Sequence, residues 1–281
     1  MPIRQSVQKV AKPYQGSVKA VIFDWAGTIV DYGCFSPTRS FVDVFKSFGV
    51  TVSDSEVRGP MGVHKKLHIE LLLQNDEIAK RWKKANGRNW TTEDVKILYE
   101  KFTPIQLETV KRYSDLIPGL LDTVSWLRRR NILIGSCTGF ATEILNALKA
   151  EAARQGFVPD CTVSAEEVPA ARPMPHMVWL NAIRLNVYPR EALVKVDDTV
   201  DGISEGIAAG CWTVGVAKSS NYTACSEEQF NSLDSQTQQE KLNTTTSILA
   251  DSGAHYIIDT VADLQPVIED INCKLKSGLL P

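Results

Sequence analysis

Short apolar runs rich in β-branched residues recur along the chain and alternate with stretches of helical character. They occupy residues 18–23, 132–135, 192–196, 212–216 and 255–258. Runs of this length, separated by helices, predict a parallel β-sheet with helices covering both of its faces. The pattern therefore indicates an α/β fold.

A long, mostly helical stretch lies between the first two runs, at residues 34–112. A crossover between neighbouring parallel strands needs only one helix, so this stretch is predicted to be an inserted helical domain. The chain then divides into a core domain, residues 1–33 and 113–281, and a helical domain, residues 34–112.

The start of the inserted stretch carries helix signals. Ser36 is a candidate N-cap, Pro37 suits a first turn, and Gly49 can end the helix. Ser53 and Glu56 have the spacing of a capping box, which predicts a second, short helix. Further helices are expected later in the insert.

Composition narrows the classes of function. The chain has 281 residues, of which 43% are apolar and 23% charged, and a formal net charge of −2. This is the composition of a globular protein, and the small net charge predicts neither a nucleic-acid nor a membrane partner. Six cysteines without CxxC spacing indicate reduced thiols in a cytoplasmic protein. The first 16 residues lack the apolar stretch of a secretory signal and are expected to be a frayed terminus, with an organelle-targeting segment as the alternative.

Polar side chains follow three of the predicted strands. Asp24 comes after the first run, Thr138 and Gly139 after the second, and Asp197 and Asp198 after the third. Ligands of such sheets bind beyond the carboxyl ends of the strands. Asp24 can attack phosphorus and form an aspartyl phosphate, although an aspartate that caps the following turn fits the same position. Thr138 and Gly139 can hold a phosphate oxygen through a hydroxyl and an amide, or they can cap a helix.

A magnesium site is predicted from the adjacent acids Asp197 and Asp198. Mg²⁺ prefers one or two carboxylates together with water and substrate oxygens, and beside Asp24 it would reduce repulsion between the nucleophile and an anionic phosphoryl group. Asp201 is a third nearby acid that can replace or support them. Arg172 is a candidate cation for the phosphate, with a surface arginine as the alternative.

These elements, in this order, resemble the four motifs of the haloacid dehalogenase superfamily, and the resemblance runs from about residue 18 to the C-terminus. It implies a doubly wound, Rossmann-like α/β core, a covalent intermediate on Asp24 and a magnesium cofactor. The insert at residues 34–112 resembles the mobile helical cap domain of that superfamily.

One position restricts which families of this superfamily the chain can resemble. Most phosphatases and mutases of the superfamily carry a second aspartate, two residues after the nucleophile, that protonates the leaving group, but here that position is Ala26. Residues 23–34, 60–68 and 168–173 are similar to the phosphonoacetaldehyde hydrolase family, whose reaction gives acetaldehyde and phosphate. In that chemistry a lysine imine accepts the electrons of the carbon–phosphorus bond, so no acid is needed at position 26.

The resemblance to this family also implies roles for individual residues. Lys65 would form the imine, His68 would shuttle protons, and Met61 would pack beside the lysine. Cys34 would lie near the substrate. The metal-binding positions would be Asp24, Ala26, Asp197 and Asp198. The resemblance further implies a homodimer built partly through the cap.

The fourth motif departs from the family pattern, which has glycine at the position of Asp197 and aspartate at the position of Gly202. Asp197 or Asp201 can compensate for the aspartate that Gly202 replaces. A phosphatase or haloacid dehalogenase on the same fold, or a catalytically silent phosphate-binding sensor, is the alternative function.

Overall fold

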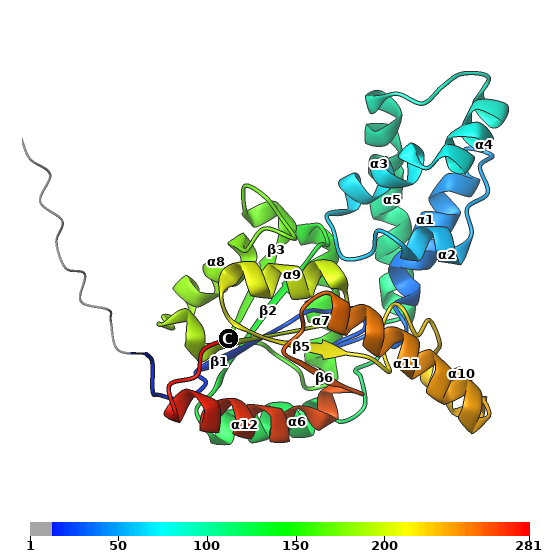
Figure 1. The fold of residues 1–281 in the computed structure, drawn as a ribbon. Helices are drawn as coiled ribbons and strands as arrows, with labels where there is room; N and C mark the ends of the chain where they lie inside the picture. Colours follow the sequence, from blue (N-terminus) through cyan, green and yellow to red (C-terminus); the bar gives the residue numbers. More distant parts are fainter. Residues whose placement is uncertain (1–12) are drawn as a thin grey trace, which may run out of the picture.

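The computed structural model describes residues 13–281, and the expectation for the first 16 residues falls largely outside this range. Its centre is a parallel sheet of six strands in the order β3-β2-β1-β4-β5-β6 (Figure 1). The strands are β1 (Ala20–Phe23), β2 (Leu133–Thr138), β3 (Cys161–Ser164), β4 (Leu193–Asp197), β5 (Trp212–Val216) and β6 (Tyr256–Ile258). The doubly wound α/β prediction is confirmed.

Five of the strands coincide with the predicted apolar runs, whereas β3 was not predicted. This strand has only four residues, Cys-Thr-Val-Ser, and lies at one edge of the sheet. It therefore lacks the continuous apolar run that marks a strand buried on both faces. The first strand occupies the middle of the sheet and pairs in parallel with both β2 and β4.

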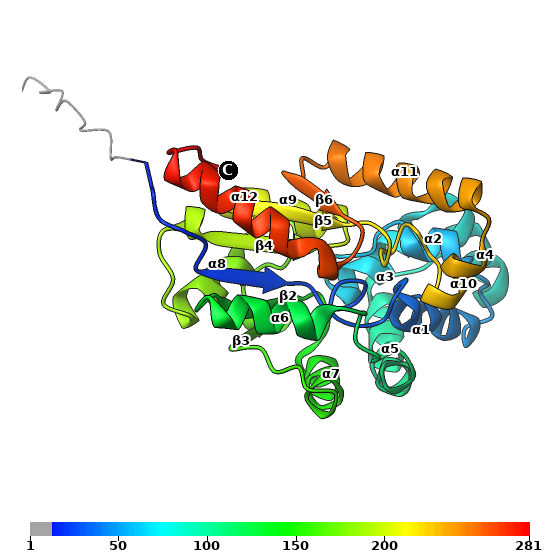
Figure 2. The ribbon, with the colours of Figure 1, turned by 90° about the horizontal axis from the view of Figure 1, so that it is seen from below.

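Alternate residues of β1 enter two separate cores. Val21 and Phe23 pack on the face covered by α6 (Leu120–Arg129), α7 (Thr142–Arg154) and α12 (Leu264–Lys276). Ala20 and Ile22 pack on the opposite face, against α8 (His176–Arg184) and the end of α9 (Val200–Ala209). Figure 2, seen from below, shows α6 and α12 lying across one face of the sheet. The short α10 (Glu227–Ser232) and the longer α11 (Ser235–Asp251) form the polar segment before β6.

The inserted stretch forms a helical body beside the carboxyl ends of the strands (Figure 1). Its helices are α1 (Phe35–Lys46), α2 (Asp54–Arg58), α3 (Lys65–Gln74), α4 (Asp76–Asn86) and α5 (Thr92–Arg112). They enclose a core of their own that includes Phe41, Phe45, Trp82 and Phe102. We call this body the cap.

The N-terminus of α1 differs from the sequence prediction. The carboxylate of Asp31, not the hydroxyl of Ser36, accepts the first helical N–H groups, those of Phe35 at 2.9 Å and Ser36 at 2.8 Å. Cys34 precedes the helix in a left-handed conformation, with φ of 54°. Ser36 lies within the first turn, where its hydroxyl is 3.3 Å from that of Thr109. The capping box of Ser53 and Glu56 at the start of α2 is confirmed.

None of the helices in residues 13–281 combines the length and apolar character needed to cross a membrane.

Candidate active site

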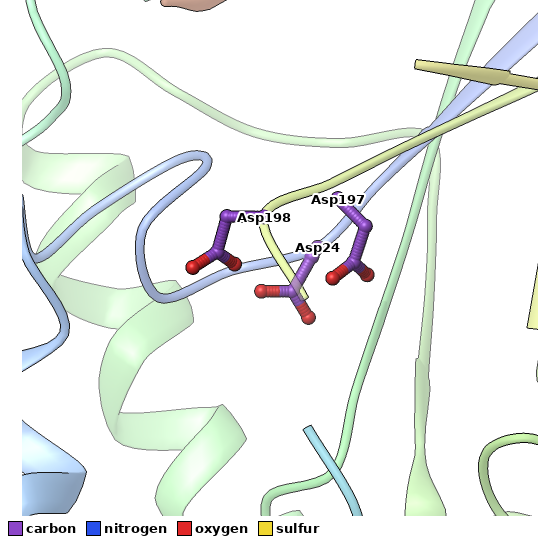
Figure 3. A group of neighbouring side chains, drawn as sticks. All are labelled: Asp24, Asp197 and Asp198. Atoms are coloured by element: carbon purple, nitrogen blue, oxygen red, sulfur yellow. The ribbon is translucent and has the colours of Figure 1, made fainter. Parts of the chain in front are cut away.

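Three carboxylates meet beyond the carboxyl ends of β1 and β4. Asp24 follows β1, Asp197 ends β4 and Asp198 is the next residue. One oxygen from each lies within 4.8 Å of the other two, and all three side chains are buried. Figure 3 shows the three carboxyl groups turned toward a common region. Because β1 and β4 are adjacent in the sheet, the fold brings together acids that are far apart in sequence.

Asp24 is held from both its backbone and its side chain. Its N–H donates to the carbonyl of Val196 at 2.9 Å, and its Oδ1 accepts a hydrogen bond from Arg172 Nη2 at 2.6 Å. Burial and the charge of Asp197 raise the pKa of Asp24 to about 6, against the opposing effect of Arg172. A carboxylate with one oxygen held by a guanidinium keeps its other oxygen for reaction with an electrophile or for a cation.

Asp198 has one oxygen bound and one free. Its Oδ2 accepts hydrogen bonds from the backbone N–H of Asn221 at 2.8 Å and from Cys34 Sγ at 3.3 Å. Its Oδ1 is buried and has no hydrogen-bond partner within residues 13–281. Burial and the charges of Asp24 and Asp197 raise the pKa of Asp198 well above its usual range. A buried carboxylate oxygen in this condition fits a ligand for a hard cation, because a cation would favour the ionised form.

The carboxylate of Asp197 is occupied by partners within the protein. Its Oδ1 accepts hydrogen bonds from the backbone and the hydroxyl of Thr199, at 3.0 and 2.7 Å. Its Oδ2 lies 2.7 Å from Lys195 Nζ and 3.1 Å from Arg172 Nη2. Burial acts to raise the pKa of Asp197, but the two cations outweigh it and bring that pKa below its usual value.

Arg172 lies inside the site and not on the surface. Its guanidinium, which is almost completely buried, pairs with Asp24, Asp197 and Glu205, the last at 3.0 Å from Nε. It also donates to the carbonyl oxygen of Cys137 at 3.1 Å. The alternative of a solvated surface arginine is therefore wrong.

Thr138 and Gly139 face the cap. Thr138 is buried at the end of β2, and its hydroxyl accepts a hydrogen bond from the N–H of Phe140 at 3.2 Å. A Cβ on Gly139 would lie 2.7 Å from the carbonyl oxygen of Val63 and 3.0 Å from that of Gly62. Only a glycine at position 139 therefore allows the cap loop to approach this closely.

Lys65 opens α3 and projects from the cap into the same region. It is only 4% exposed, its Nζ lies 3.9 Å from Met61 Sδ, and the ammonium is 5.0 Å from the centre of the Phe140 ring. Burial lowers the pKa of Lys65 to about 8, while the charge of Asp24 acts in the opposite direction. About a tenth of this lysine is therefore the nucleophilic free amine at pH 7, far more than of an exposed lysine.

His68 lies one turn beyond Lys65 on α3 and is completely buried. Its Nε2 is 2.8 Å from the carbonyl oxygen of Val57, so Nε2 carries the proton. Its Nδ1 has no hydrogen-bond partner in the described part of the chain. Burial and the charge of Lys65 lower the pKa of His68 well below its usual value, and the ring is therefore a neutral imidazole with a free acceptor nitrogen.

A small cavity between cap and core collects most of these groups. It is lined by Asp24, Ala26, Cys34, Pro37, Met61, Gly62, Lys65, Thr138, Gly139, Phe140, Arg172 and Thr199. His68, Asp197 and Asp198 lie outside this lining. A larger hollow against α8, which includes Trp179 and Tyr188, is mainly apolar and is remote from the carboxylates. The chemistry therefore points to the smaller cavity.

Sequence reasoning missed four polar residues of the region. Lys195 and Glu205 are completely buried beside Asp197 and Arg172. Asn221 binds Asp198 from a loop, and Arg58 of the cap binds Asn221. A lysine at position 195, inside a predicted buried strand, was a signal that could have identified the first of them.

Comparisons with known proteins agree on one family. The model of the haloacid dehalogenase-like hydrolases matches residues 18–210. A phosphonoacetaldehyde hydrolase of Pseudomonas fluorescens is 44% identical over 265 residues, which span 94% of this chain and 96% of the relative. One from Syntrophobacter fumaroxidans is 40% identical over 270 residues, spanning 96% and 98%. The crystal structure of a phosphonoacetaldehyde hydrolase-like protein from Oleispira antarctica superposes with a TM-score of 0.96 at 39% identity, covering 98% of this chain and 100% of the other.

Proposed function

The chain belongs to the haloacid dehalogenase-like hydrolases and, within them, to the phosphonoacetaldehyde hydrolases, and we propose that it hydrolyses phosphonoacetaldehyde to acetaldehyde and phosphate. The observation that carries this function is the pairing of a buried, low-pKa Lys65 with Asp24 in one cavity. The same cavity has alanine, not an acid, at position 26. These residues suit a reaction in which the leaving group is a carbon atom next to an imine. The imine accepts the electrons of the broken bond, so no acid is needed to protonate the leaving group.

Lys65 begins the reaction as a nucleophile. Its free amine adds to the aldehyde carbon, and one proton passes from the nitrogen to the oxygen. A further proton taken up from solvent lets this oxygen leave as water, which gives a protonated imine. His68 is proposed to pass the first of these protons from the nitrogen to the oxygen, because its neutral ring keeps Nδ1 free to accept a proton and its low pKa favours giving the proton up again. The packing of Met61 and Phe140 around Nζ excludes water and keeps the amine partly unprotonated.

Asp24 then takes the phosphoryl group. Its carboxylate oxygen bonds to phosphorus, the carbon–phosphorus bond breaks, and the electron pair moves through carbon to the imine nitrogen, forming an enamine. Protonation at carbon and hydrolysis of the resulting imine release acetaldehyde and free Lys65, and a second water cleaves the aspartyl phosphate. Arg172 and the Thr138–Gly139 corner are proposed to bind the phosphoryl oxygens.

Magnesium is the proposed cofactor of this family member. Asp24 and the free Oδ1 of Asp198 are the groups suited to hold it, and Ala26 can contribute only its backbone oxygen. Mg²⁺ supplies positive charge where two anionic groups must approach each other. Asp197 completes the acidic group, although its oxygens already have partners.

A homodimer and a cytoplasmic location are also proposed. Leu67 and Leu71, one turn apart on α3, are 41% and 37% exposed and offer an apolar surface on the cap. The cysteines are unpaired in the described residues, which suits a reducing compartment.

Release of acetaldehyde from phosphonoacetaldehyde, with and without a chelator, tests the proposed function. We expect turnover that a chelator abolishes and Mg²⁺ restores. Hydrolysis of phosphate esters without activity on the phosphonate would instead indicate a phosphatase. Binding of phosphate and Mg²⁺ without any turnover would indicate a sensor.

A further inference from the structure

Two glycines of α9 face two charged residues of β4. A Cβ on Gly202 would lie 1.9 Å from the Cγ of Asp197, and a Cβ on Gly206 would lie 2.6 Å from the Cγ2 of Thr213 and 2.9 Å from the Cβ of Lys195. The glycines are one helical turn apart, and the two charged residues are two positions apart on one face of the strand. The helix therefore carries glycine at the two places where β4 presents Asp197 and Lys195.

The space beside these glycines holds a cluster of four buried charged residues. Lys195 Nζ lies 2.7 Å from Asp197 Oδ2 and 3.8 Å from Glu205 Oε2. Arg172 bridges the same two acids, at 3.1 Å to Asp197 and 3.0 Å to Glu205. These four residues carry two positive and two negative charges, and Arg172 pairs in addition with Asp24 at 2.6 Å, a third acid outside the cluster.

Asp197 and Asp198 differ in what their oxygens contact. Both oxygens of Asp197 accept hydrogen bonds from Thr199 or pair with the cations, whereas Oδ1 of Asp198 has no partner in the described part of the chain. A metal ion bound directly to Asp197 would compete with Lys195 and Arg172. The two adjacent acids therefore differ in whether an oxygen is left without a partner for a cation to bind.

We propose that Lys195, Asp197 and Glu205 form a positioning network that fixes Arg172 against Asp24, and that Asp197 acts through Arg172 and not as a direct metal ligand. The inference rests on the proposed function only where its test measures kcat. Arg172 Nη2 contacts Asp24 Oδ1 at 2.6 Å, so a rigid guanidinium also fixes the orientation of the nucleophile. This network makes use of Asp197 and Gly202, the two departures in the fourth motif.

Isosteric variants of the two acids separate positioning from metal binding. The probe is Mg²⁺ alone, and its binding is followed by isothermal titration calorimetry. We expect Asp197→Asn to change the Mg²⁺ dissociation constant by less than about threefold while kcat falls about 10- to 100-fold. Asp198→Asn should weaken Mg²⁺ binding by more than about tenfold. Equal weakening of Mg²⁺ binding by both variants would overturn the proposal.

The network itself is tested with Lys195→Met, Asp197→Asn and the double variant. Residues that act as one unit have non-additive effects, so the double variant should lose no more kcat than the worse single variant. Losses that multiply, or a Lys195→Met enzyme with unchanged kcat, would contradict a shared network. If the wild-type protein itself releases no acetaldehyde, the proposed function fails, and the Mg²⁺ titration still tests the role of Asp197.

A stability cycle tests the packing without any substrate. Gly202→Ala should lower the melting temperature sharply in the wild-type background because its Cβ meets Asp197. The same change in an Asp197→Gly background should cost much less. Additive losses in thermal unfolding would show that Asp197 and Gly202 are not coupled and would overturn the packing that the network requires.

Discussion

Arg58 of the cap and Asn221 of the core bind each other's backbone. Arg58 Nη1 donates to the carbonyl oxygen of Asn221 at 2.9 Å, and Asn221 Nδ2 donates to the carbonyl oxygen of Arg58 at 3.0 Å. The backbone N–H of Asn221 also donates to Asp198 Oδ2 at 2.8 Å. The position of the cap is therefore linked through one residue to the carboxylate proposed to hold the metal.

Arg58→Ala tests this link. Arg58 also donates to the carbonyl of Gly33 at 2.7 Å, at the junction of cap and core, so its loss should loosen cap closure and the support of Asp198. We expect kcat/KM to fall about 10- to 100-fold, measured by acetaldehyde release. Arg39→Ala is the matched control, because Arg39 forms an exposed ion pair with Asp54 within the cap. Equal activities of the two variants would show that Arg58 has no role in closure.

The pH dependence of turnover should reflect Lys65. With a pKa of about 8, the lysine is mostly protonated below that value, and one pH unit lower only about a tenth of it is free amine. We therefore expect kcat/KM to rise with pH up to about 8 and then to level off. A rise that continues toward the pKa of an exposed lysine would show that Lys65 is solvated in the working enzyme.

Trapping with borohydride identifies the lysine that forms the imine. In the presence of phosphonoacetaldehyde, reduction should attach a label to Lys65, located by mass spectrometry of peptides. Lys65→Arg retains the charge but cannot form an imine, so it should lose both label and turnover. Lys66→Arg, at the neighbouring exposed position, should retain both. An active but unlabelled wild-type enzyme would exclude the imine route.

Stability should change in the opposite direction from activity when the lysine is made apolar. The folded-state pKa of Lys65 lies below its usual value of 10.5, so burial of the ammonium costs about 3 kcal/mol at neutral pH. This cost shrinks as the pH rises toward the unfolded-state pKa. Lys65→Met should therefore raise the free energy of unfolding at pH 7, measured with urea, and less so at pH 10, while turnover is lost. Lys66→Met should change stability little at either pH.

The strand ends were predictable because a simple pattern marks them. A mostly apolar run followed by an acid identifies Asp24 and the pair Asp197 and Asp198 without any knowledge of the fold, because parallel strands align their carboxyl ends. β3 was missed because an edge strand of four residues has no such run. Ser36 was a reasonable N-cap by residue type, but Asp31 caps the helix through a backbone turn that local propensity does not describe.

The residues that support the site, such as Lys195 and Asn221, could not be predicted, and the reason is a different one. Lys195 breaks the rule that central strands are apolar, and its burial is tolerated only because Asp197 and Glu205 lie within 4 Å. Asn221 reaches Asp198 through its backbone N–H, a contact that the identity of the side chain does not encode. Such contacts depend on the packing of loops, which the sequence pattern leaves open.

The proposed dimer can be tested on the helix that also carries the lysine. Lys65 and His68 are on the buried face of α3, whereas Leu67 and Leu71 are exposed. Aspartates at Leu67 and Leu71 should convert a dimer to monomers in sedimentation velocity, because two buried charges would face the partner cap. Leu121→Asp, at a similarly exposed position on α6 of the core, should leave the dimer intact. A monomeric wild-type protein would show that no dimer forms. A dimer broken only by Leu121→Asp would place the contact on α6 of the core. If the dimer forms through α3, the monomeric variant should also lose part of its kcat, since the same helix carries Lys65, which lines the cavity together with Asp24.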